Sequence, residues 1–247
     1  MHRFQDYHWD TVIGESLRAL DLNPSLDTPH LYLAAAYFHL GLLEEAGSAV
    51  ATARQLNPEN RVEPLEILGA VSLFGGRTSE AVGHLSQVQH LSDSRIVRYL
   101  LGWALYYEGE QRRAEAMLET MIDEEGPLPG NARATLAALW AARWATSEAR
   151  ALAERVASEP DLIHHGAYGL GTAYAQLGDP TTALRWLKQA ATTGFPCYPW
   201  YERDPLLDPI RRDKRFVSFM RELRRTWEDA RAEHAGTGGQ PGASRSP

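Results

Sequence analysis

The chain is poor in cysteine, and this scarcity excludes a disulfide framework. Cys197 is the only cysteine among the 247 residues, so a single chain cannot form a disulfide. Because this lone thiol has no cysteine partner and no recognisable catalytic motif around it, we expect it to be a small, partly buried apolar group rather than a nucleophile.

Long apolar runs are also absent. No stretch approaches the roughly 18–20 consecutive apolar residues that cross a bilayer. Residues 1–6 lack the apolar core of a secretory signal. We therefore expect a soluble protein of the cytoplasm with no membrane partner.

Positive charge is in deficit. The chain has 25 Lys and Arg against 32 Asp and Glu, which gives a formal net charge of −7. Proteins that bind nucleic acids usually carry a basic face, and this composition supplies none. We expect no nucleic-acid partner.

Catalytic signatures are missing as well. The sequence contains no glycine-rich phosphate loop ending in Gly-Lys-Ser/Thr, no His-Glu-x-x-His and no Gly-x-Ser-x-Gly. The segment 169–171 has two glycines, but it falls inside an expected helix with no strand before it. We expect no enzyme activity, no catalytic residues and no cofactor.

The adjacent pair His164 and His165 does not change this expectation. Neighbouring residues on a helix point about 100° apart. A metal site generally takes three or four ligands, and one pair cannot supply them. We interpret the pair as a helix start exposed to solvent, and we expect no metal ion.

What the chain does contain is a repeat. Alanines recur at intervals of 33–35 residues, each preceded twelve residues earlier by another small residue. Four of the five alanines have a glycine five residues before them, and Trp144 takes that place in the fourth copy. The positions are Ala46, Ala81, Ala114, Ala149 and Ala183, with Ala34, Gly69, Gly102, Ala137 and Gly171 twelve before and Gly41, Gly76, Gly109 and Gly178 five before.

This spacing predicts pairs of antiparallel helices of about 14 residues, which are marginal alone and must stack. The small residues allow the two helices of a pair to approach closely. The glycine ends the first helix because it accepts a left-handed backbone without steric cost. Proline after Asn23, Asn57 and Glu159 marks the ends of second helices.

The pattern resembles the tetratricopeptide repeat (TPR) family over roughly residues 6–197. The segments that carry the resemblance run from Leu33 to Pro58 and from Leu170 to Ala190. The resemblance implies an all-α, right-handed superhelical solenoid of antiparallel helix pairs. We expect a partial first repeat, then five repeats near 27–60, 62–95, 95–128, 130–162 and 164–197. The unpaired first helix indicates the edge of a longer array, or a place where another molecule docks.

We expect helices near 7–21, 27–40, 43–56, 61–74, 78–91, 94–108, 111–124, 130–143, 146–158, 163–176 and 179–192. A C-terminal cap over 198–234 should contain an amphipathic helix near 213–233, introduced by Asp208 and Pro209. Residues 235–247 should be disordered. The segment 204–216 resembles the ends of repeat arrays in bacterial serine/threonine kinases and in winged-helix or cyclase-type regulators, which implies a signalling setting.

The resemblance also implies a concave groove lined by five positions of each first helix. In this chain they are Thr28, Leu31, Ala35, Phe38 and His39; Glu63, Glu66, Ala70, Leu73 and Phe74; Ile96, Tyr99, Trp103, Tyr106 and Tyr107; Asn131, Ala134, Ala138, Ala141 and Ala142; and His165, Tyr168, Thr172, Ala175 and Gln176. The set contains no Lys or Arg, so we expect no clamp for a partner's C-terminal carboxylate.

The third of these helices is densely aromatic. Tyrosine and tryptophan are frequent in binding hot spots because they combine apolar area with a hydrogen-bonding edge. We expect an exposed aromatic patch that holds a partner segment with apolar anchors. The candidate partner-binding residues are Phe38, His39, Phe74, Tyr99, Trp103, Tyr106, Tyr107 and Tyr168.

Three functions remain open at this stage. The first is a non-catalytic protein-interaction scaffold in bacterial signalling or regulation. The second is a regulatory part of a larger enzyme, such as a serine/threonine kinase. The third is a self-association module that forms a homo-oligomer through its N-terminal end.

Overall fold

The computed structural model describes residues 8–124, 127–143, 145–159 and 162–234, and all regular secondary structure in these ranges is helical. Within the same ranges, no helix combines the length and the apolar character needed to cross a membrane. The segment 235–247, which we expect to be disordered, lies outside the described residues.

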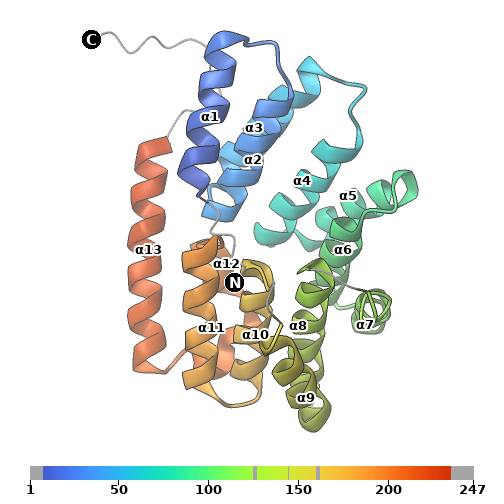
Figure 1. Ribbon diagram of the computed structural model, residues 1–247, viewed down its shortest axis with the longest axis vertical. Coiled ribbons are helices and arrows are strands. Elements are labelled where there is room, and N and C mark those ends of the chain that lie inside the picture. Colours follow the sequence, from blue (N-terminus) through green and yellow to red (C-terminus); the bar gives the residue numbers. More distant parts are fainter. Residues whose placement is uncertain (1–7, 125–126, 144, 160–161, 235–247) are drawn as a thin grey trace.

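The helices follow one another as antiparallel pairs along a curve (Figure 1). Helix α1 (Trp9–Leu22) comes first. The pairs are α2 (Thr28–Leu40) with α3 (Leu43–Leu56), α4 (Val62–Phe74) with α5 (Thr78–Leu91), α6 (Arg95–Tyr107) with α7 (Gln111–Glu119), α8 (Pro127–Ala142) with α9 (Thr146–Ala157), and α10 (His164–Gln176) with α11 (Pro180–Thr193). The all-α solenoid of stacked helix pairs is confirmed.

Glycines end the first helix of four pairs, as the repeat predicts. Gly41, Gly76, Gly109 and Gly178 have φ of 80°, 78°, 92° and 74°. A side chain with a Cβ strains this left-handed backbone, so glycine is favoured there. Trp144, which replaces the glycine in the fourth pair, lies outside the described residues.

Close approach of paired helices also depends on glycine residues at the contact. A Cβ added to Gly69 would lie 2.5 Å from Cδ2 of Leu85, and one added to Gly171 would lie 2.5 Å from Cδ2 of Leu187. Both distances are far below van der Waals contact. The repeating small residues therefore let a leucine of the second helix pack directly onto the backbone of the first.

Two helix boundaries differ from the prediction. Helix α7 ends at Glu119 rather than at residue 124, and turns follow it. Thr120 closes the helix with a hydrogen bond of 2.7 Å from its hydroxyl to the carbonyl of Met117. Helix α8 begins at Pro127 rather than at residue 130, which agrees with the preference of proline for the first helical turn.

The C-terminal part departs further from the prediction. A short helix α12 (Tyr198–Arg203) and a 3₁₀ helix η1 (Pro205–Ile210) precede the long helix α13 (Lys214–His234). The expectation that Asp208 and Pro209 begin the long helix is wrong, because both lie inside η1. Asp204 caps η1, since its carboxylate accepts a hydrogen bond of 2.9 Å from the backbone N–H of Leu206.

The two ends of the array are joined. The indole N–H of Trp9 on α1 donates to the carbonyl of Gly194, after α11, at 2.7 Å. The indole N–H of Trp227 on α13 donates to the carbonyl of Gly41, after α2, at 3.0 Å. Helix α13 therefore packs on α11 and also reaches back to the first pair (Figure 1).

Candidate functional site

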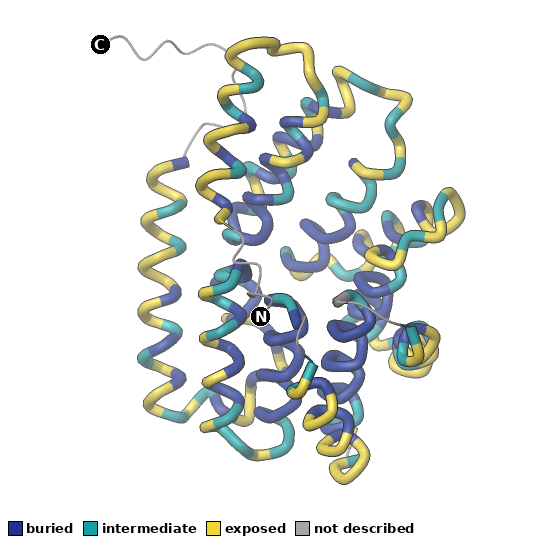
Figure 2. Tube along the Cα trace, in the orientation of Figure 1, coloured by how far each residue is buried: buried dark blue, intermediate teal, exposed yellow. Residues whose placement is uncertain are grey.

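The first helices of the pairs form the inside of the curve. Helices α2, α4, α6, α8 and α10 contact one another in succession, and their paired second helices lie outside. Figure 2 shows buried residues concentrated on these inner helices, with exposed residues on α13 and the outer turns. The inside of the curve is thus the surface where we expect a binding site.

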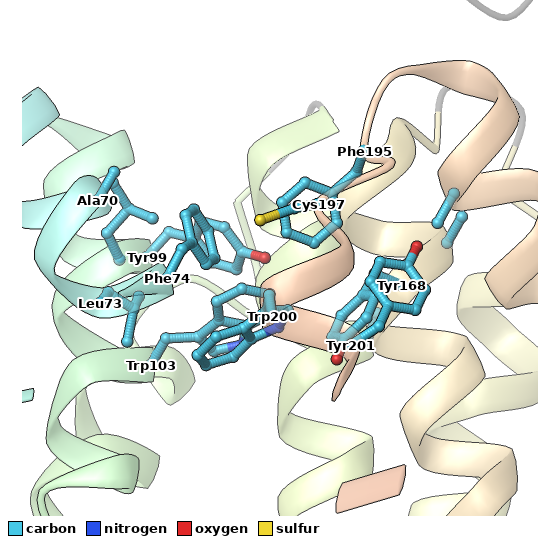
Figure 3. Close-up of a cluster of buried hydrophobic side chains, with 14 of the residues drawn as sticks. Ala70, Leu73, Phe74, Tyr99, Trp103, Tyr168, Phe195, Cys197, Trp200 and Tyr201 are labelled. Atoms are coloured by element: carbon cyan, nitrogen blue, oxygen red, sulfur yellow. The ribbon is translucent and has the colours of Figure 1, made fainter. Parts of the chain in front are cut away.

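A segment of the chain itself fills part of this surface. We call residues 195–204 the returning segment. Phe195, Cys197, Trp200 and Tyr201 in it are at most 2% exposed. The ring of Trp200 stacks on Trp103, with centroids 5.7 Å apart. Figure 3 shows these side chains between helices α4 and α6 on one side and α10 on the other.

Asp204 fastens the end of the returning segment. Its carboxylate accepts hydrogen bonds from the hydroxyls of Tyr107, at 2.8 Å, and Tyr168, at 2.5 Å. The residue is fully buried. Burial raises the pKa of Asp204, and the hydrogen bonds from Tyr168, Leu206 and Tyr107 act in the opposite direction.

The eight candidate residues do not form the exposed aromatic patch that the sequence predicts. Of the eight candidate residues, six are buried and two are half-buried. The buried ones are Phe38, His39, Phe74, Tyr99, Trp103 and Tyr168, and the half-buried ones are Tyr106 and Tyr107. Aromatic spacing on one helix face does not tell whether the chain itself or a partner covers that face.

Five of the eight candidates contact aromatic rings of the returning segment, namely His39, Phe74, Trp103, Tyr107 and Tyr168. The rings of Phe74 and Tyr107 contact Trp200, at centroid distances of 5.3 and 4.8 Å. Tyr168 contacts Tyr201 at 4.8 Å, and Tyr106 packs against Tyr107. A partner could reach the buried members of this group only by displacing the returning segment, and the role of these candidates in partner binding stays a prediction.

Another part of the inner surface, formed by α2 and the first turns of α4, α6, α8 and α10, is open. It forms a groove with a free volume of about 540 Å³, which we call the concave groove. Phe38, His39 and Tyr99 of the eight candidates line it. Most of the positions that the family resemblance places on the first two inner helices lie there too, namely Thr28, Leu31, Ala35, Phe38, His39, Glu63, Glu66 and Ala70.

Apolar side chains dominate the concave groove. Tyr32 and Ile96 at its edge are 58% and 41% exposed, which is high for large apolar residues. The polar exceptions besides threonine and histidine are Glu63 and Glu66. Burial raises the pKa of Glu66, and a hydrogen bond from Ser94 opposes this shift. No Lys or Arg is among the described residues that line the groove.

Three histidines lie at the base of the concave groove. His164 and His165, at the start of α10, are 3% and 8% exposed, so the expectation of a solvent-exposed helix start is wrong. His39 on α2 adds a third ring, and one ring nitrogen from each lies within 4.8 Å of the others. The sequence shows only the adjacent pair, because His39 is 126 residues away from His165.

The pKa of all three imidazoles is lowered. Burial lowers the pKa of His164 to about 4, while a backbone hydrogen bond with Thr193 opposes the shift. Burial, followed by the charge of His164, holds the pKa of His39 well below its usual range, and a hydrogen bond with Ala35 opposes this shift. Burial, followed by the charges of His164 and His39, does the same for the pKa of His165. Neutral imidazole offers a lone pair, so the cluster could hold a metal ion.

The sequence pattern does not indicate several residues of the site. Trp9 lines the concave groove and stacks on His39 with ring centroids 4.3 Å apart. Trp200 and Asp204 complete the filled part. Prolines around 196–209 indicated an irregular segment but gave no sign that it enters the array. Only the abundance of aromatic residues in 195–201 could have suggested burial.

Comparisons with known proteins give limited information. A scan against protein-family models gives no match, and a search of curated proteins also gives none. Among solved structures, this chain is similar to one described as YrrB, a TPR protein with an unusual peptide-binding site. The alignment covers 71% of this chain and 90% of that chain, with 19% identity and a TM-score of 0.45.

Proposed function

We propose that this chain is a non-catalytic scaffold that holds an apolar segment of a partner protein in the concave groove. The observation that carries the proposal is the groove itself, about 540 Å³ of open space lined mainly by apolar side chains. Water in contact with such a surface is released when an apolar segment binds, which favours association.

The groove also defines the chemistry of the partner. Tyr32 and Ile96 offer exposed apolar surface at the edge, where anchors of the partner would pack. Glu63 and Glu66 supply the negative charge of the groove. A segment with two or three large apolar residues and a neighbouring Lys or Arg therefore fits best, because the basic side chain would meet these carboxylates.

A peptide-display selection tests this function directly. The wild-type chain should select segments with apolar anchors next to a basic residue, and fluorescence polarisation should then give their affinities. The variant Ile96→Glu should weaken binding at least about 10-fold, since it puts a charge into an apolar contact. Trp103 is unsuitable for this test, because its ring packs against Trp200 and its removal would disturb the fold.

Leu91→Glu is the matched control. Leu91 is 49% exposed, similar to Ile96, but it does not line the groove. Binding should be unchanged in this variant. Failure to enrich any common sequence, or equal affinity for wild type and Ile96→Glu, would contradict the proposal.

The biological setting is a further part of the proposal. A cytoplasmic role in bacterial signalling or regulation is supported by the resemblance of residues 204–216 to the ends of repeat arrays in regulators. The alternatives are a regulatory part of a larger enzyme and a self-association module. A mass that stays constant over a wide concentration range in ultracentrifugation would argue against self-association.

A further inference from the structure

The histidine cluster is made by two helices that are distant in the sequence. His39 is on α2, and His164 and His165 begin α10. The three rings are each at most 8% exposed, and all three line the concave groove. The free space of the groove therefore reaches the rings from one side, while the protein covers them from the others.

The ring orientation of His39 resembles that of a metal ligand. Its Nδ1 lies 2.7 Å from the carbonyl oxygen of Ala35, so Nδ1 carries the hydrogen and donates it. Nε2 then has a lone pair. Histidines that bind metals generally donate their other ring N–H to a carbonyl or carboxylate, which fixes the tautomer in this way.

The distance between two rings matches tetrahedral coordination. Nε2 of His39 and Nε2 of His165 are 3.2 Å apart. Two nitrogens bound to one tetrahedral Zn²⁺ at the usual bond length lie about 3.3 Å apart. One ring nitrogen of each of the three histidines lies within 4.8 Å of the other two, so a small movement of the His164 ring would complete a set of three ligands.

The three residues are buried, and one of their ring nitrogens is left unpaired. Among the described residues, Nδ1 of His165 has no hydrogen-bond partner.

We propose that His39, His164 and His165 bind a divalent transition-metal ion, with Zn²⁺ the best match, at the base of the concave groove. Imidazole ligands suit zinc, copper and nickel, and the tetrahedral spacing favours zinc among them. Three protein ligands leave a fourth position toward the groove, where water or a group of a bound molecule is held. This inference does not depend on the peptide-binding proposal.

Metal titration of the full chain without a polyhistidine tag tests the site. Isothermal titration calorimetry with Zn²⁺ should show one ion per chain. Co²⁺ should give the visible absorption of a four- or five-coordinate ion, and Zn²⁺ should abolish it. At a free Zn²⁺ concentration 100 times its Kd, the Tm should rise by about 5–10 °C.

Substitutions of single histidines show where the ion binds. His39→Gln and His165→Gln should each weaken Zn²⁺ binding at least about 100-fold, because each removes one of three ligands. His90→Gln is the control, since His90 is exposed on α5 and outside the cluster. Circular dichroism in a chelator should show the same helicity in all three variants.

NMR of the wild-type chain tests the same site without any substitution, so the result does not depend on how the variants fold. The imidazole ¹⁵N signals of His39, His164 and His165 should shift when Zn²⁺ is added, while that of His90 should not. Absence of binding by the wild type, or shifts confined to other histidines, would overturn the proposal. Unchanged affinity in His165→Gln would also overturn it.

Discussion

At the scale of single residues, Asp204 links the end of the returning segment to the inner helices α6 and α10. It is a fully buried carboxylate that accepts hydrogen bonds from Tyr107, Tyr168 and the backbone of Leu206. A buried carboxylate is costly unless its oxygens are satisfied, and these three donors satisfy them. The same residue begins η1, so it links the returning segment to the inner helices.

Replacing Asp204 should therefore destabilise the fold strongly. Asp204→Ala leaves the buried hydroxyls of Tyr107 and Tyr168 without their acceptor, and we expect a loss of about 2–4 kcal/mol in the free energy of unfolding. Asp208→Ala is the control, because Asp208 forms only a surface ion pair with Arg211 and should cost less than about 1 kcal/mol. Urea unfolding measures both. Equal effects of the two substitutions would contradict this role of Asp204.

At the scale of helices and turns, most of the structure follows from the sequence pattern. The boundaries of α2 to α6 lie within one residue of the prediction, because apolar spacing, turn glycines and Asn-Pro pairs all indicate the same positions. Helices α12 and η1 were missed. Prolines at 196, 199, 205 and 209 argue against a long helix, but they do not indicate whether short helical turns form between them.

Two glycine substitutions test the packing of a helix pair, and we expect them to change stability in opposite directions. Gly69→Ala places a methyl group 2.5 Å from Leu85 across the α4–α5 contact and should destabilise by about 1–3 kcal/mol. Gly83→Ala lies within α5, where an added Cβ meets no atom within 4 Å, and should stabilise by about 0.5–1 kcal/mol. Thermal unfolding reports both changes. A stabilising Gly69→Ala would show that the small residue is not needed for helix approach.

At the scale of the whole molecule, the sequence predicts a solenoid but not how its inside is used. The repeat spacing places aromatic residues on inner helices, and that much could be predicted. Which residues cover them depends on contacts between segments about 100 residues apart, such as Trp103 with Trp200. The histidine cluster depends on an even longer separation, between His39 and His165. No local pattern carries this information, because it arises when the two ends of the array meet.

Closure of the array has consequences for function. The contacts of Trp9 with Gly194 and of Trp227 with Gly41 join the N-terminal and C-terminal pairs. The returning segment then fills one part of the inner surface, and the concave groove remains in another. Both the proposed partner site and the proposed metal site lie in the open part, so both depend on this division of the surface.

The reactivity of Cys197 tests this division most directly, because the thiol is fully buried within the returning segment. Burial raises its pKa to about 12. At pH 8, a thiol of that pKa has roughly 1,000-fold less thiolate than a free cysteine, and a buried sulfur is also inaccessible to reagent.

We predict that Cys197 in the native chain reacts with Ellman's reagent at least about 1,000-fold more slowly than in the urea-unfolded chain. Trp200→Ala, which removes the ring between Phe74, Trp103 and Tyr107, should increase the native rate. Reaction of the native chain at the rate of the unfolded one would contradict the account, because the returning segment would then lie outside the array.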